Sequence, residues 1–246
     1  MISVLVFTRD DAAWLGRCLG ALAGDSPEEL DVVVFDNVST DDTGQVVRSW
    51  RGARGEQARL ITATVDTSFS EGNNALIAAA DGDVSVILNP DTEPSPAMLH
   101  ALAERLRTSP RIAMVGPRLV FPDGTPQSNG WRLPTPTQLL AERLARRERE
   151  VPPSGAGETD VGWLMGCCLA AHTPELRAVG GFDLGFWFHG TDLELCGRMG
   201  KRGRIVRLDE HVLIHRGHRD WTPERITAAR KATARWLLRS APRLLG

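Results

Sequence analysis

The sequence contains no apolar run close to the roughly 20 residues that a transmembrane helix needs. No basic segment precedes the first apolar residues at Ile2, so nothing indicates a secretory signal. The four cysteines lack C-x-x-C spacing and fall in apolar segments, which is not the pattern of a small disulfide scaffold. A reducing compartment is the simpler inference, and we expect a cytoplasmic protein.

Two further absences exclude classes of function. The 29 basic and 31 acidic residues leave a formal net charge of −2, so the composition gives no reason to expect a nucleic acid partner. The first predicted strand is not followed by G-x-G-x-x-G, the dinucleotide-binding fingerprint, which argues against a dehydrogenase. With 246 residues, the chain fits one large α/β domain or two small ones.

The sequence does contain alternating strand and helix patterns. Short apolar runs rich in β-branched residues predict strands over 2–7, 31–35, 60–65 and 84–88. Apolar residues at helical spacing separate them, with Asp10 or Asp11 expected to cap the first helix and an alanine-rich helix expected after Asn74. Such alternation implies βαβ units and right-handed crossovers. We therefore predict an α/β fold with a mostly parallel sheet in its first half.

Polar residues follow every predicted strand. Because the carboxyl ends of parallel strands form the ligand-binding edge of an open α/β sheet, we expect these residues to lie together. Asp91, at the end of V-S-V-I-L-N-P-D, suits a hard divalent cation that bridges to substrate phosphates. A solvated turn acid is the alternative at this position. The full set is Thr8, Arg9, Asp36, Asn37, Asn73, Asn74 and Asp91.

The second half of the sequence has a mixed pattern. We predict a helix over 96–107, an apolar strand region over 112–121 and a hairpin turning at 122–125. Residues 142–157 are dense in arginine and glutamate and then in proline and glycine, which indicates an exposed helix end and a loop; a phosphate- or lipid-binding patch is the alternative. Two short strands over 205–208 and 212–215 and a closing helix over 223–238 complete the chain.

The stretch around Thr191 admits two interpretations. Thr191 and Glu194 have capping-box spacing, which would begin a helix with Asp192 in its first turn. The same placement suits chemistry, because a rigidly held carboxylate beside the aromatic residues at 186–188 can take a proton from a substrate hydroxyl.

Taken together, these segments resemble glycosyltransferase family 2, and specifically its rhamnosyltransferase-like branch with a GT-A fold. The matching motifs run in the same order from residue 2 to residue 218 and are V-L-V-F-T-R-D, D-N-V-S-T-D-D-T, F-S-E-G-N-N, L-N-P-D, W-L-M-G-C-C-L, V-G-G-F-D, T-D-L-E-L-C-G-R and V-L-I-H. Each motif alone is weak, whereas their common order is specific.

The resemblance implies roles for the matching residues. Asp192 would be the catalytic base, and Asp91 would hold a divalent cation, Mg²⁺ or Mn²⁺, with the donor diphosphate. His215 would be either a further metal ligand or a strand-ending histidine with local hydrogen bonds. The resemblance assigns nucleotide-sugar binding to Thr8, Arg9, Asp36, Asn37, Ser39, Phe69, Asn74 and Asp91, and the acceptor side to Trp163, Gly166 and Thr191.

Three positions depart from the family pattern. Thr191 stands where glutamate is usual, and Glu194 where aspartate is usual, which puts the local acid geometry and the acceptor contacts in question. Ser68 replaces the usual glycine before Phe69 and is expected to tighten that turn. Since Asp91 and Asp192 are both present, we still expect an active enzyme.

The activity implied by the resemblance is inverting, metal-dependent transfer of a sugar, such as a 6-deoxysugar like rhamnose, from a dTDP or UDP donor to an acceptor hydroxyl. The acceptor would be a glycan or a secondary metabolite, and a lipid-linked acceptor would bring the protein to a membrane. We expect a single domain with a nucleotide-sugar half over 1–95, an acceptor-side half over 96–220 and a C-terminal helix over 221–246, and we leave the oligomeric state open.

Two alternatives remain at this point. One is a catalytically silent domain that binds a sugar nucleotide. The other is a sugar-phosphate nucleotidyltransferase, which is disfavoured because Thr8 to Asp11 contains none of the glycine expected in its phosphate-binding loop.

Overall fold

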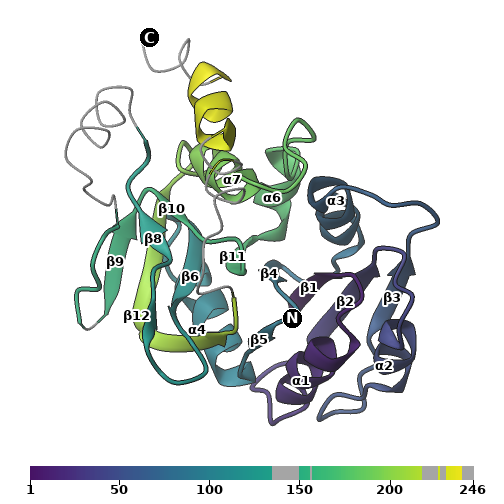
Figure 1. Ribbon diagram of the computed structural model, residues 1–246. Helices are drawn as coiled ribbons and strands as arrows, with labels where there is room; N and C mark the ends of the chain where they lie inside the picture. The colour runs from purple at the N-terminus through teal and green to yellow at the C-terminus, as the bar shows by residue number, and fades with distance from the viewer. Residues whose placement is uncertain (135–149, 156, 218–226, 228–230, 240–246) are drawn as a thin grey trace.

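Four parallel strands form one half of the central sheet in the computed structural model, which describes residues 1–134, 150–155, 157–217, 227 and 231–239 (Figure 1). β1 lies between β2 and β4, and β3 pairs with the other edge of β2. The parallel half expected from the sequence is therefore confirmed, although the third strand ends at Thr62 rather than at residue 65. The strands are β1 (Ile2–Thr8), β2 (Leu30–Asp36), β3 (Arg59–Thr62) and β4 (Val84–Leu88).

β11 joins this half to a mixed second half, because it runs antiparallel to β4 on one side and to β6 on the other. β12 runs parallel to β6 and also pairs with β9 and β5, and β7 pairs with β6 as the predicted hairpin requires. β8 and β10 form a separate two-stranded ribbon. These strands are β5 (Thr92–Glu93), β6 (Ile112–Val120), β7 (Pro126–Gln127), β8 (Gly130–Trp131), β9 (Glu158–Val161), β10 (Trp163–Leu164), β11 (Cys168–His172) and β12 (Arg204–His215).

The prediction of two short strands over 205–208 and 212–215 is wrong. Both segments belong to β12, which pairs with β6 along its length. A register shift between Leu208 and Val212 absorbs the intervening residues as a bulge. The polar stretch at 209–211 therefore bends the strand without ending it.

Helices cover both faces of the sheet. Leu19, Val47 and Leu102 of α1, α2 and α4 belong to one buried cluster, while Leu76 of α3 and Leu195 of α7 belong to the other. Figure 1 shows α1 and α2 on the opposite side of the parallel strands from α3. The result is a three-layer α/β architecture. The helices are α1 (Ala12–Leu22), α2 (Thr43–Ser49), α3 (Phe69–Ala79), α4 (Pro96–Arg107), α6 (Thr173–Ala178) and α7 (Thr191–Met199).

The starts of α1 and α3 differ from the prediction. Ser68 caps α3 by accepting from the Glu71 N–H, and the Glu71 carboxylate accepts from the Ser68 N–H, so the helix already begins at Phe69. Residues 69–74, expected to lead into the helix, are helical. Asp11 occupies the cap position of α1, but the side chain that accepts from the first helical N–H is Asp41.

The predicted capping box of α7 is also wrong. The cap residue is Gly190, which has a φ of 78°, and Thr191 is the first helical residue. Glu194 pairs with Arg198 one turn later instead of reaching back to the cap (2.5 Å). Asp192 does lie in the first turn, as expected.

Some predictions fall outside the described residues. The helix end and loop predicted over 142–157 can be compared only at 150–155 and 157, and the first part of the closing helix lies in 218–226. Residues 231–239 are helical, in agreement with the prediction. Among the residues that the structure describes, no helix has the length and apolarity required to span a membrane.

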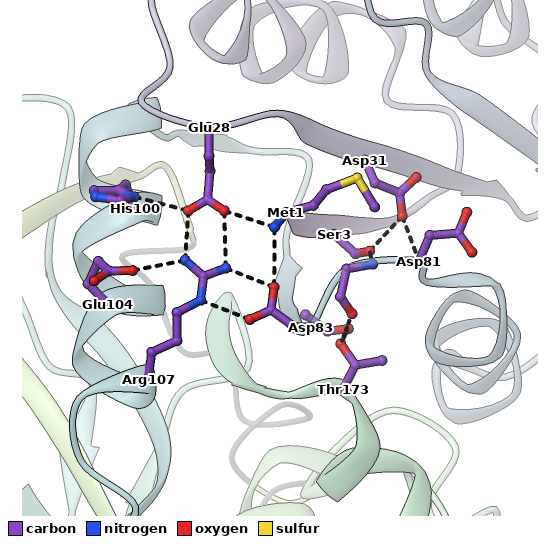
Figure 2. A network of polar contacts seen from close by, with 12 residues as sticks. Met1, Ser3, Glu28, Asp31, Asp81, Asp83, His100, Glu104, Arg107 and Thr173 are labelled. Atoms are coloured by element: carbon purple, nitrogen blue, oxygen red, sulfur yellow. Dashed lines mark hydrogen bonds and ion pairs between the residues drawn. The ribbon is translucent and has the colours of Figure 1, made fainter.

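A charge network ties α4 to the loops before β2 and β4 (Figure 2). The Arg107 guanidinium donates to both carboxylate oxygens of Glu28, at 2.9 and 3.0 Å, and to both of Asp83, at 2.8 Å each. His100 Nδ1 lies 3.0 Å from Glu28. Although burial opposes ionisation of Glu28, its contacts with Arg107 and His100 lower its pKa from 4.5 to about 2. The Arg107 hydrogen bonds lower the pKa of Asp83 to about 2 as well.

The network predicts acid sensitivity of the fold. Because both folded-state pKa values lie below the ordinary values, the stabilisation is present above pH 4.5 and is lost as the pH falls towards 2. We expect Arg107→Gln to lower the urea-unfolding midpoint at neutral pH and to flatten its dependence on pH across this interval. The exposed Arg48→Gln is the matched control, and equal slopes for the two variants would contradict the prediction.

Candidate active site

The loops after β1 and β2 are hydrogen-bonded to each other at the carboxyl edge of the sheet. The Asp10 N–H donates to Ser39 Oγ (2.9 Å), the Thr40 N–H donates to Asp10 Oδ1 (2.7 Å), and the Ser39 N–H donates to Asp36 Oδ1 (3.0 Å). Asp10 and Val38 have φ angles of 51° and 59°. A left-handed valine is an outlier, and strain of this kind concentrates at functional sites.

A second set of contacts connects β1 and β2 to the loop after β3. Asn37 Nδ2 donates to Asp66 Oδ1 (2.9 Å), Asn37 Oδ1 accepts from the Thr67 N–H (2.9 Å), and Arg9 Nη1 lies 2.9 Å from Asp66. Thr8 is buried, and its Oγ1 has no hydrogen-bond partner among the described residues. The edge thus brings together Thr8, Arg9, Asp36, Asn37 and Ser39, while their contacts with a nucleotide stay a prediction.

Asp91 meets the end of β12. Its backbone oxygen accepts from the Arg216 N–H (3.0 Å), its Oδ2 accepts from the Gly217 N–H (3.2 Å), and its Oδ1 lies 3.5 Å from His215 Nε2. Burial opposes ionisation of Asp91, but His215 and the Gly217 N–H together hold its pKa below the ordinary value. Asp91 is therefore ionised at neutral pH.

The residues around Asp91 fit a divalent cation. His215 Nδ1 lies 2.9 Å from Gln127 Oε1, and when Nδ1 donates this hydrogen bond in the neutral imidazole, the Nε2 lone pair could bind a metal in place of the direct contact with Asp91. No group of three or more His, Cys, Asp or Glu side chains forms a metal cage in the described part of the chain. The Asp91 carboxylate suits Mg²⁺ or Mn²⁺, which would complete their coordination with water and substrate phosphates, and His215 could add one nitrogen ligand.

Sequence reasoning missed two residues beside Asp91. The Arg216 guanidinium stacks on Trp14 of α1, 3.7 Å from the ring centroid, while the Arg216 N–H donates to the Asp91 carbonyl. Burial and the nearby charge of Asp91 raise the pKa of Asp11. Arg216 follows the V-L-I-H motif directly, but nothing in the sequence pairs it with the indole of Trp14, 202 positions earlier.

Asp192 lies in the first turn of α7, next to the segment that leads into β11. Its Oδ2 accepts from the Gly166 N–H (3.1 Å), and its Oδ1 accepts from the Leu193 N–H (2.8 Å). Burial of the carboxylate outweighs these hydrogen bonds and raises its pKa. A Cβ at position 166 would lie 3.3 Å from Asp192 Cβ, so glycine permits the close approach.

The predicted acceptor-side residues surround Asp192. Thr191 Oγ1 donates to the Phe188 carbonyl (3.1 Å). Trp163 stacks on Trp131, with ring centroids 4.3 Å apart, and Trp131 was not predicted. The buried Trp163 Nε1 has no partner among the described residues. The two indoles occupy paired positions in the β8–β10 ribbon, a long-range pairing without a local sequence signal.

Phe69 and Asn74 lie on α3, between the two halves. Phe69 packs edge-on against Phe7, Phe182 and Phe188. Asn74 Nδ2 donates to the Phe182 carbonyl (2.9 Å), and Asn74 Oδ1 accepts from the Phe182 N–H (2.7 Å). The amide of Asn74 therefore holds the loop before α7, and its contact with a nucleotide-sugar stays a prediction.

The sequence profile described as glycosyl transferase family 2 matches residues 3–163, and the chain belongs to that family. It is a glycosyltransferase, in agreement with the resemblance found in the sequence. The N-acetylglucosaminyl-diphospho-decaprenol L-rhamnosyltransferase of Mycobacterium tuberculosis is 26% identical over 243 residues, an alignment that covers 89% of this chain and 77% of the relative.

Solved structures confirm the GT-A fold. TarS 1–349 of S. aureus in complex with UDP has a TM-score of 0.64 at 17% identity, with coverage of 96% of this chain and 66% of that one. The mannosyltransferase PcManGT from Pyrobaculum calidifontis, in complex with GDP-Man and Mn²⁺, has a TM-score of 0.63 at 18% identity, with coverage of 98% and 75%. At these identities the likeness establishes the fold alone.

The contacts of Asn74 predict a role in stability. We expect Asn74→Ala to lower the free energy of unfolding by about 2 kcal/mol, because it leaves the buried N–H and C=O of Phe182 without partners. Asn74→Asp keeps the acceptor for the N–H and should lose less. Urea unfolding measures both variants, and an unchanged midpoint for Asn74→Ala would contradict the assignment.

Proposed function

We propose that the protein catalyses inverting, metal-dependent transfer of a sugar from a nucleoside diphosphate to an acceptor hydroxyl. The observation that carries the proposal is a pair of carboxylates near the β4–β11 junction. The pKa of Asp91, which follows β4, is lowered, and the pKa of Asp192, which accepts from the Gly166 N–H before β11, is raised. The ionised Asp91 suits a cation that binds a diphosphate, and Asp192 suits proton transfer.

The donor half of the proposal places the nucleotide across the ends of β1 and β2. Thr8, Arg9, Asp36, Asn37 and Ser39 would surround the base and ribose, with Phe69 and Asn74 bordering the nucleotide-sugar. We assign the nucleotide-sugar half to residues 1–95, the acceptor-side half to 96–220 and the C-terminal helix to 221–246. Support comes from the hydrogen-bonded loops at this edge and from the buried Thr8 hydroxyl, which has no hydrogen-bond partner among the described residues.

In the proposed reaction the acceptor oxygen attacks the anomeric carbon as the bond from that carbon to the diphosphate oxygen breaks. Asp192 accepts the hydroxyl proton, and the Gly166 and Leu193 N–H groups hold its carboxylate in place. A divalent cation at Asp91 and His215 would stabilise the charge that develops on the leaving phosphate. One displacement inverts the anomeric centre and needs no covalent enzyme intermediate.

The relative from Mycobacterium tuberculosis supports a finer proposal for the substrates. Its name states rhamnosyl transfer to a decaprenol-diphosphate-linked sugar. We therefore assign a 6-deoxysugar such as rhamnose, carried on dTDP or UDP, as the donor and a lipid-linked glycan as the acceptor. A soluble secondary metabolite is the competing acceptor, and assays with both acceptor types distinguish them. If the acceptor is the lipid-linked glycan, the protein would work in the cytoplasm at the membrane surface.

Nucleotide binding tests the metal assignment. In calorimetric titrations with UDP and dTDP, we expect binding in Mn²⁺ that is lost with a chelator and in Asp91→Ala, because Asp91 would hold the cation that binds the diphosphate. Asp25→Ala, at an exposed acid outside the site, is the matched control. Equal binding by wild type and Asp91→Ala in Mn²⁺ would overturn the metal assignment.

Turnover tests Asp192. We expect Asp192→Asn to keep UDP binding and to lower kcat by about 10² to 10⁴, the usual contribution of a general base. In the wild type, kcat should fall as the pH drops through the raised pKa of Asp192, because the protonated acid cannot accept the proton. Gly166→Ala should also lower kcat by displacing Asp192, whereas Gly20→Ala, with no atom within 4 Å of the added methyl, should not.

Two outcomes would contradict the proposed function or the role of Asp192. Nucleotide binding without turnover, and without further loss in Asp192→Asn, would identify a catalytically silent domain. Turnover that is independent of the ionisation of Asp192 would refute its role as the base.

A further inference from the structure

Exposed apolar side chains gather near the amino end of α7. Leu184, Trp187 and Phe188 are 62%, 63% and 58% exposed, and Leu238 in the C-terminal helix is 78% exposed. Of the seven large hydrophobic side chains that are exposed in the described part of the chain, these are four. A concentration of this kind marks an interaction surface more often than chance.

The helix at 231–239 is attached to the same loop. Arg235 Nη1 donates to the Gly185 carbonyl (2.5 Å), and Arg239 Nη1 pairs with Asp183 (2.7 Å). The guanidinium groups of Arg235 and Arg239 lie 5.9 and 5.4 Å from the Phe186 ring centroid. Figure 1 shows this helix beside α7, away from α1 and α2. Loop and helix thus form one surface.

This helix has an apolar inner side and a basic outer side. Ala232 and Trp236 are 9% and 6% exposed, and Trp236 belongs to a buried cluster with Phe186 and Leu193. The exposed residues include Lys231, Arg235 and Arg239, and the segment 231–239 contains no acidic residue. The apolar side fixes the helix. Arg235 and Arg239 are exposed but bonded to the loop, whereas Lys231 has no hydrogen bond or ion pair with the described residues.

We propose that Leu184, Trp187, Phe188, Lys231 and Leu238 form a docking surface for an anionic lipid bilayer. Aromatic and aliphatic side chains that insert at the headgroup level, combined with Lys and Arg that meet anionic lipids, are the two components of reversible membrane binding. The adjacent cations favour a bilayer over a protein partner, because a protein surface could cover the apolar residues without requiring them.

The surface is contiguous with the candidate active site. Asp192 follows Trp187 by five residues and Phe188 by four, and the Trp187 carbonyl accepts from the Phe69 N–H (3.1 Å). A docked bilayer would therefore present a lipid-linked hydroxyl close to the proposed base. Membrane binding itself rests on the surface alone, whereas this use of it rests on the proposed function.

Co-sedimentation with vesicles tests the proposal. We expect the full chain to bind phosphatidylglycerol-containing vesicles, to bind pure phosphatidylcholine vesicles weakly, and to lose affinity in high salt. Leu184→Ser with Trp187→Ser should lower the partition coefficient by about tenfold or more. Lys231→Glu, at a residue without structural contacts in the described chain, should lower it by roughly tenfold on anionic vesicles only. Val65→Ser (67% exposed) and Lys201→Glu are the matched controls and should bind like the wild type.

The same variants are titrated with UDP and Mn²⁺ in the absence of lipid. Unchanged nucleotide binding with weaker vesicle binding supports the docking surface. Absence of vesicle binding by the wild type, or equal losses in the controls, overturns it whether or not the protein binds nucleotide. Normal vesicle binding by Leu184→Ser with Trp187→Ser, combined with a higher KM for a water-soluble acceptor, would also overturn it and would assign these residues to acceptor binding instead.

Discussion

The antiparallel pairing of β11 with β4 is the interaction on which the candidate site depends. Leu88 pairs with Cys168, and one residue further the Asn89 N–H donates to the Cys167 carbonyl (2.9 Å). From the end of β4 at Leu88 the chain continues to Asp91. On the other strand, Gly166 precedes β11, and its N–H donates to the Asp192 carboxylate. Both carboxylates are therefore positioned by the same buried backbone ladder. Every residue of β4 is buried, so this ladder cannot shift without disturbing the core.

The two carboxylates acquire different properties from their surroundings. Burial opposes ionisation of Asp91, but His215 and the Gly217 N–H favour its charged form, whereas burial of Asp192 outweighs its backbone hydrogen bonds and the nearby His189. This separation is the electrostatic requirement of the proposed reaction, since the first group must stay ionised against a diphosphate and the second must be able to take up a proton. Neither the lowered pKa of Asp91 nor the raised pKa of Asp192 requires a movement of the backbone.

Sequence reasoning succeeded where the signal is local. Buried parallel strands are continuous apolar runs, so β1, β2 and β4 and the polar residues at their ends could be recognised from the sequence. It failed where contacts join distant segments: the pairing of Asn74 with Phe182, the stacking of Trp14 on Arg216, and the bulge that keeps β12 whole. The early start of α3, by contrast, does have a local signal, because Ser68 and Glu71 stand at capping-box spacing.

The loop 183–188 links the helices that carry the two halves of the site. The Phe69 N–H donates to the Trp187 carbonyl (3.1 Å), and Ser70 Oγ donates to the Phe186 carbonyl (2.7 Å), which ties the loop to the start of α3. Thr191 Oγ1 donates to the Phe188 carbonyl and ties it to the start of α7. A glutamate carboxylate at position 191 could only accept hydrogen bonds and could not make this one. The departure from the family pattern at Thr191 therefore has a structural explanation. The threonine fastens the exposed aromatic loop to α7 and leaves Asp192 in place in the first turn of that helix.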